Sequence, residues 1–330
     1  DILKDVVKNI RKKIIQLGGE VRFSSKLEYI KSNNGKIKSI IVNGDEIPCD
    51  ALVLALGHSS RDTYEMLHKI GIFMEPKAFA IGVRIEHPQE MINVGQYGKM
   101  ASHPRLHAAS YNLTYQSKDL GRGVYSFCMC PGGVVVAAAS EENRLVSNGM
   151  SYHARDKANS NSALVVTVGP EDFEGTSVLR GMEFQRHYES LAYKVGGGGY
   201  KAPVQLLGDF VNDRKSTKLG AVIPSYEPGF EFADMRECLP SYVVDGIKEG
   251  VNNFDRKIKG YGREDAVLTG IETRTSAPVK ITRNERLESI SLSGLYPCGE
   301  GAGFAGGIVS AAVDGIKVAE RIIEKYSAIQ

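Results

Sequence analysis

The strongest constraint on the fold is a glycine-rich loop between a short apolar segment and the last predicted helix. The segment that ends at Gly299 and Glu300 predicts a strand, and residues 308–325 have the periodicity of a helix. Five of the nine residues in 299–307 are glycine, which is more than a strand-to-helix turn needs. The loop therefore predicts a backbone that approaches a ligand closely. The alternative is a glycine-rich corner without a ligand.

Three of these glycines, Gly301, Gly303 and Gly306, have the spacing GxGxxG. In a dinucleotide-binding fold this motif opens a βαβ unit, and a second strand carries an acidic residue about 20 positions later. Only twenty-four residues follow Gly306, and they predict a helix. The loop is therefore not expected to be a Rossmann phosphate loop.

A strand, a glycine loop and a helix in this order are typical of the end of the FAD-binding domain in flavoproteins. The Glu300 carboxylate is then expected to accept a hydrogen bond from a ribityl or ribose hydroxyl. The N–H groups at the start of the helix would face the pyrimidine edge of the flavin and stabilise negative charge there. The apolar run Ala51–Leu56, followed by Gly57, predicts a second strand-to-loop junction over the same cofactor.

The length of 330 residues favours two domains, or one domain with a large insertion. Residues 1–77 predict a helix over 2–17, a short strand at Val21–Phe23, a β-meander, a buried strand and a second helix that Asp62 caps. Residues 78–270 predict a β-rich and helical domain, and residues 271–330 return to the first domain. The expected class is α/β with a β-rich insertion.

Composition limits the function classes. The chain has 41 Lys and Arg against 39 Asp and Glu and lacks a basic block, so nothing favours nucleic acid or an anionic membrane as a partner. Five cysteines without CxxC spacing argue against a disulfide framework and favour the cytoplasm. No apolar run approaches the roughly 20 residues that a spanning helix needs.

Several blocks of sequence resemble the bacterial FAD-dependent dehydrogenases often labelled NAD(FAD)-utilising dehydrogenases. These blocks are spread over essentially the whole chain: Leu54–Thr63, Phe79–Pro88, Tyr125–Gly133, Asn148–Asp156, Glu272–Pro278 and the closing loop through Lys317. Members of that family begin with a strand, a true GxGxxG and a helix that bind the FAD pyrophosphate. Because no such unit precedes the first residue, Asp1, the resemblance implies an incomplete Rossmann-like, three-layer FAD/NAD(P)-binding domain around a large substrate domain.

The resemblance also implies cofactor-binding residues, with FAD as cofactor in the longer protein and NAD(P)H as a possible electron donor. The residues of the closing loop that would line the flavin are Gly299, Glu300, Gly306, Gly307 and Ile308. Gly57 and His58 would form the loop over it, and the turn at Lys26 and Leu27 would present backbone to the adenine. Thr273 and Arg274 would lie beside the isoalloxazine ring. The substrate stays unidentified.

Candidates for chemistry each have a plain structural alternative. Arg274 could orient an anionic substrate, or be a surface arginine paired with an acid such as Glu272. His87 could act as an acid or base, but most histidines in turns have no such role. His153 and Arg155 could face the substrate or form a salt-bridged loop. No metal site is expected.

The pair Cys128 and Cys130 alternates along a predicted strand, so both side chains are expected on one face. A disulfide between them would be strained, and two small buried hydrophobic residues are the favoured interpretation.

Three functions are compatible with these patterns. The first is an FAD-dependent oxidoreductase in which the flavin transfers hydride and residues 78–270 recognise the substrate. The second is a flavin-dependent RNA-modifying protein, which the formal net charge of +2 does not favour. The third is a binding or scaffold protein that retains the fold without the chemistry.

Overall fold

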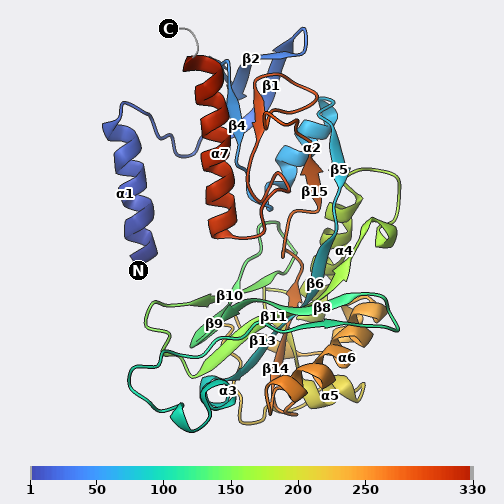
Figure 1. The fold of residues 1–330 in the computed structure, drawn as a ribbon. Coiled ribbons are helices and arrows are strands. Elements are labelled where there is room, and N and C mark those ends of the chain that lie inside the picture. Colours follow the sequence, from blue (N-terminus) through green and yellow to red (C-terminus); the bar gives the residue numbers. More distant parts are fainter. Residues whose placement is uncertain (1, 328–330) are drawn as a thin grey trace. The chain divides into compact units, whose positions relative to one another are not determined.

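The computed structural model describes residues 2–327, and the chain divides into two compact units. The first unit comprises residues 1–77, 175–182 and 276–330, of which residue 1 and residues 328–330 lie outside the description. The second unit comprises residues 78–174 and 183–275. Helices and strands occur in both, so the fold is mixed α/β (Figure 1).

A seven-stranded mixed sheet is the centre of the second unit (Figure 1). Its strands, in spatial order, are β13 (Phe230–Phe232), β12 (Ala202–Leu206), β14 (Val267–Glu272), β6 (Phe79–Pro88), β11 (Asn159–Val168), β8 (Gly123–Cys130) and β7 (Thr114–Gln116). All neighbours are antiparallel except β12 and β13. The central strands β6, β11 and β14 are buried on both faces, which explains their long apolar runs. A separate hairpin pairs β9 (Gly133–Ala137) with β10 (Ser147–Ser151).

Helix α6 (Ser241–Lys257) packs closely on this sheet because two small residues face it. A Cβ atom at Gly246 would lie 2.9 Å from the Val166 side chain, and one at Gly250 would lie 2.6 Å from Val124. Its buried apolar residues recur every three or four positions, as an amphipathic helix requires. The other elements are α3 (Gln89–Tyr97), η1 (Gly98–Met100), η2 (Pro170–Asp172), α4 (Arg180–Val195), α5 (Leu207–Val211) and η3 (Met235–Glu237).

The first unit joins three small sheets to helices (Figure 1). The meander consists of β1 (Leu27–Asn33), β2 (Lys36–Val42) and β3 (Asp45–Pro48). Strand β4 (Leu52–Leu54) pairs in parallel with β16 (Leu295–Pro297), and β5 (Met74–Pro76) pairs antiparallel with β15 (Val279–Ile281). The helices are α1 (Ile2–Gln16), α2 (Arg61–Lys69) and α7 (Ile308–Ser327). Tyr64, Leu67 and Leu295 belong to the buried core of this unit.

The structure confirms the predicted helices over 2–16 and 308–327 and the predicted β1–β2 hairpin. Three local predictions were wrong. Val21–Phe23 forms no strand. The strand expected over Ala51–Leu56 is only Leu52–Leu54, and Val53 in its centre is 42% exposed rather than buried. Helix α2 is preceded by Ser60 as its N-cap, so Asp62 lies inside the first turn instead of capping it.

Two helices of the first unit expose apolar side chains. Within the described residues, α1 has no buried residue, and its apolar face includes Ile2, Leu3, Val7, Ile10 and Ile14. Helix α7 exposes Ile308, Val309, Ile316 and Ile323. The predicted amphipathic pattern of α1 is confirmed, but the described chain does not cover its apolar face.

Candidate functional site

The closing glycine loop of the first unit is fixed by a buried ion pair between Arg283 and Asp314. Arg283 Nη2 lies 2.6 Å from Asp314 Oδ1, and its Nη1 donates to the Pro297 carbonyl. Asp314 Oδ2 accepts from the Gly299 N–H at 2.8 Å. Burial alone would raise the pKa of Asp314, but the bonds from Arg283 and Gly299 outweigh it and hold that pKa below its usual range. The start of the loop is therefore held in place by Asp314 of α7 and its partner Arg283.

The loop also meets the junction at Gly57 at very short range. A Cβ atom at Gly301 would lie 2.3 Å from the Gly57 carbonyl oxygen, so only glycine permits this approach. The hydroxyl of buried Tyr64 donates to the Gly301 carbonyl at 2.7 Å and lies 3.2 Å from the Gly57 carbonyl. Burial, and then the charge of Glu300, raises the pKa of Tyr64, so this hydroxyl stays protonated and able to donate.

The beginning of α7 is open. A Cβ atom at Gly306 would meet nothing within 4 Å, and one at Gly307 would meet only Ser310 Oγ, at 3.9 Å. Ile308 and Val309 are 80% and 77% exposed. The first N–H groups of a helix lack intrahelical acceptors and carry partial positive charge. This end of α7 can therefore receive an electron-rich group of a ligand.

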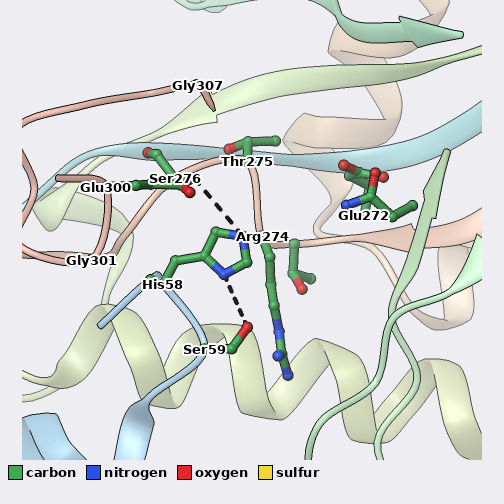
Figure 2. A network of polar contacts seen from close by, with 12 residues as sticks. His58, Ser59, Glu272, Arg274, Thr275, Ser276, Glu300, Gly301 and Gly307 are labelled. Carbon is green, nitrogen blue, oxygen red and sulfur yellow. Dashed lines mark hydrogen bonds and ion pairs between the residues drawn. The ribbon is translucent and has the colours of Figure 1, made fainter. Parts of the chain in front are cut away.

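His58 and Glu300 place polar groups beside this loop. His58 Nε2 lies 3.9 Å from Glu300 Oε1, and His58 Nδ1 lies 3.0 Å from Ser59 Oγ (Figure 2). Both side chains are partly exposed. Lys77 lies near the same carboxylate: burial lowers its pKa, and the charge of Glu300 opposes that shift. The Glu300 carboxylate can therefore accept a hydrogen bond from a ligand hydroxyl.

Lys26 and Leu27 lie in the same unit, and both backbone groups of Lys26 are hydrogen-bonded to Asn43. The Lys26 N–H donates to Asn43 Oδ1 at 2.9 Å, and its carbonyl accepts from the Asn43 N–H. Leu27 begins β1 and pairs with Val42. The Lys26 ammonium forms an exposed ion pair with Asp62.

Arg274 and Thr273 lie in the second unit and belong to a buried network. Arg274 Nη2 lies 3.2 Å from Glu189 Oε2, and Arg274 Nη1 donates to Ser140. The Thr273 hydroxyl donates to Glu189 Oε1 at 2.7 Å. Arg274 is only 5% exposed, so of the alternative of a surface arginine paired with an acid, the pairing is found, with Glu189, but the surface position is not. Glu272 is instead paired with Arg84, 2.7 Å away.

The other candidates have contrasting environments. His153 is exposed, and Arg155 lines a surface pocket of about 560 Å³ together with Gln89, His107 and Lys157. His87 is fully buried, and its Nε2 donates to the Tyr261 carbonyl at 2.7 Å. The pocket gives Arg155 access to a small molecule, whereas His87 has the environment of a core residue.

The burial of His87 predicts a pH dependence of stability. Burial lowers the pKa of His87 to about 4. In the unfolded chain this side chain is protonated below about pH 6.5, whereas in the folded chain it stays neutral down to about pH 4. Stability is therefore expected to fall by about 3 kcal/mol from this residue as the pH drops from about 6.5 to about 4. In His87→Gln, the amide still donates but does not titrate. Urea unfolding of this variant should show a weaker loss in acid than the unaltered chain.

The matched control is His68→Gln on the exposed face of α2. Its acid dependence should equal that of the unaltered chain. Equal slopes for all three proteins would contradict the assignment of the effect to His87.

Within residues 2–327, no group of three or more His, Cys, Asp or Glu side chains is arranged to hold a metal ion. No helix in this described part is long and apolar enough to cross a membrane.

Comparison with known proteins assigns the family. A family model described as "FAD-dependent protein, C-terminal domain-like" matches residues 78–275, which is more than half of the chain. The chain belongs to this family. The matched region begins where the second unit begins and ends at the same residue, Thr275. The family domain thus contains the seven-stranded sheet, the Arg274 network and the Arg155 pocket.

Two further comparisons cover nearly the whole chain. An uncharacterized protein of Clostridium beijerinckii is 74% identical over 326 residues, which are 99% of this chain and 61% of that protein. The chain therefore spans about three fifths of that relative. A crystal structure described as an oxidoreductase from Methanosarcina mazei is 14% identical, with a TM-score of 0.39, over 96% of this chain and 54% of that one.

Sequence reasoning missed the residues that hold the loop of this FAD-dependent family member. Asp314 carries a weak signal, because it is a carboxylate four residues before the buried Val318 on α7. Tyr64 and Arg283 carry none. Tyr64 bonds to the carbonyl of Gly301, which lies 237 residues away, and Arg283 bonds to the carbonyl of Pro297 and to Asp314, 14 and 31 residues away. Lys77 becomes notable only once Glu300 is seen near it.

Proposed function

We propose that the longer protein containing this chain is an FAD-dependent oxidoreductase, and that the first unit holds the flavin end of FAD. The observation that carries this proposal is the close approach of Gly301 to Gly57 beside the open first turn of α7. Two loops held together by Tyr64 form a small-residue platform next to exposed N–H groups. The membership in an FAD-dependent family supports the choice of cofactor.

The residues present fit such a group. Beside Gly306 and Gly307 the space that a Cβ would occupy is free, so a planar ring can approach the backbone. Glu300, partly exposed, would accept a hydrogen bond from a ribityl or ribose hydroxyl. The N–H groups of Ile308 and its neighbours would face the pyrimidine edge. Bound FAD would supply hydride transfer, while these residues orient it and favour negative charge at that edge.

We further propose that the FAD pyrophosphate is held by residues outside this chain. Two findings support this: the Clostridium relative is longer than the chain, and the first unit exposes apolar faces on α1 and α7. The second unit, which includes the pocket at Arg155, is proposed to recognise the substrate. NAD(P)H is the proposed electron donor.

Titration with FAD tests the cofactor assignment. The expected result is saturable quenching of flavin fluorescence by the longer protein, with at least roughly hundredfold weaker binding to residues 1–330 alone, because phosphate contacts contribute several kcal/mol. Bleaching of the bound flavin by NADH or NADPH would then test the oxidoreductase assignment. Absence of FAD binding to the longer protein would refute the proposal, and binding without reduction by any donor would favour a scaffold function.

A further inference from the structure

The two cysteines of β8 lie at an irregularity in the sheet of the second unit. Along the β11–β8 ladder, Asn161 pairs with Cys130 and Ala163 pairs with Phe127. Two residues of β8 therefore oppose one residue of β11, which is a β-bulge. Cys128 is the bulged residue and has φ +46°, a left-handed conformation that costs a non-glycine residue about 1–2 kcal/mol.

The bulge places the Cys130 thiol against the backbone of Cys128. Cys130 is buried and Cys128 is exposed, so the prediction of two small buried hydrophobic residues was wrong for Cys128. The Cys130 thiol donates to the Cys128 carbonyl oxygen, 3.3 Å away, so its sulfur packs against the bulged residue. The expectation that a disulfide between Cys128 and Cys130 would be strained assumed a regular strand. The bulge removes that assumption, because it redirects one side chain relative to the other.

A buried cation stands next to this pair. Arg84 of β6 is fully buried, and its Nη1 donates to the Cys128 carbonyl at 2.9 Å. Glu272 of β14 balances its charge from 2.7 Å, and Asn148 of β10 accepts from its Nη2. The charged and titratable groups that act on the Cys128 sulfur are therefore Arg84, Glu272 and Cys130.

These neighbours separate the two thiols chemically. The neighbouring Cys130 thiol lowers the pKa of Cys128 to about 5, against the effect of burial and with help from Arg84. The nearby Cys128, together with burial, raises the pKa of Cys130. At neutral pH the exposed sulfur is thus a thiolate, and the buried one retains its proton. An exposed thiolate beside a buried protonated thiol is the arrangement of an attacking and a resolving cysteine.

We propose that Cys128 and Cys130 form a redox-active dithiol that reduces small organic disulfides. The Cys128 thiolate attacks one sulfur of the disulfide, breaks its S–S bond and releases the first thiolate, leaving a mixed disulfide on Cys128. Cys130 then gives up its proton to the released thiolate, and its sulfur attacks the Cys128 sulfur. This step forms the Cys128–Cys130 bond and expels the second thiolate. Two electrons pass from the dithiol to the organic disulfide.

The test uses oxidised glutathione as the disulfide probe, followed by alkylation and peptide mapping by mass spectrometry. The unaltered chain should yield a 128–130 peptide that has lost two hydrogens and carries no glutathione. Cys130→Ser should stop at a glutathione adduct on Cys128, because the resolving thiol is missing. Cys128→Ser should leave Cys130 unmodified. An adduct that persists on Cys128 in the unaltered chain, or no reaction at either cysteine, would overturn the proposal.

A second measurement separates activation from mere exposure. The iodoacetamide labelling rate of Cys128 should change little between about pH 6 and about pH 8.5, whereas an ordinary thiol with a pKa near 8.5 slows about a hundredfold at the lower pH. In Cys130→Ser, the rate at the lower pH should fall at least roughly tenfold. The partly buried Cys49 serves as the internal control, because burial raises its pKa. An ordinary pH profile for Cys128 in the unaltered chain would also refute the proposal.

Discussion

Gly301→Ala is expected to weaken FAD binding to the longer protein by about tenfold to hundredfold. The new Cβ would lie 2.3 Å from the Gly57 carbonyl oxygen and 2.7 Å from the Gly57 carbonyl carbon. Backbone atoms cannot yield as a flexible side chain can, so the two loops must separate. Forcing a methyl group into such a contact costs about 1–3 kcal/mol, which converts to the stated loss if the binding platform depends on the contact. Isothermal titration calorimetry with FAD measures the change in the dissociation constant.

Two comparison variants make this result interpretable. Gly315→Ala lies inside α7, where an added Cβ meets nothing within 4 Å, and it should leave FAD affinity unchanged. Tyr64→Phe keeps the glycine contact but removes the hydroxyl bonds to the two carbonyls, so its effect should be smaller than that of Gly301→Ala. Equal FAD affinity in all variants would show that the Gly57–Gly301 contact does not shape the cofactor site.

Arg84→Met is expected to lower the free energy of unfolding by about 3–5 kcal/mol. Arg84 and Glu272 are a fully buried ion pair in the middle of the seven-stranded sheet. Removing the cation leaves a buried carboxylate without its partner, and such losses are large. The carbonyl of Cys128 and the side chain of Asn148 lose a donor as well. Urea denaturation followed by circular dichroism provides the measurement.

The double variant Arg84→Met with Glu272→Leu distinguishes charge burial from packing. If the unpaired carboxylate causes the loss, the double variant should recover most of the stability, because an apolar pair can replace a buried ion pair. Arg321→Met removes the exposed ion pair with Glu324 on α7 and should cost less than about 1 kcal/mol. A single variant as stable as the unaltered chain would contradict the assigned role of Arg84.

Much of the local structure could be predicted because it depends on neighbours in sequence. The helices at 2–16 and 308–327 follow from apolar spacing, and the β1–β2 hairpin follows from its turn residues. The short strand β4 was predicted too long, since an apolar run does not reveal how many residues find a pairing partner. It pairs with β16, which lies far away in the chain.

Part of the candidate site could be predicted from the sequence, and part could not. Glycine density marked the closing loop and the junction at Gly57, since only backbone conformation and close approach require that residue. The ion pair of Arg283 with Asp314 could not be inferred, because many carboxylates compete for each arginine in a chain with 39 acids. For the same reason, Glu189 could not be singled out as the partner of Arg274.

The sequence by itself determined the kinds of elements, their order and the position of the glycine loop, because periodicity and glycine placement act over a few residues. Only the tertiary structure decided which distant groups meet. It set Gly301 against Gly57, buried Arg84 with Glu272, and placed the Cys130 thiol at the Cys128 carbonyl through a β-bulge. The physical reason is that charge pairing, burial and sulfur contact depend on distances in space, which strand register sets and local sequence does not encode.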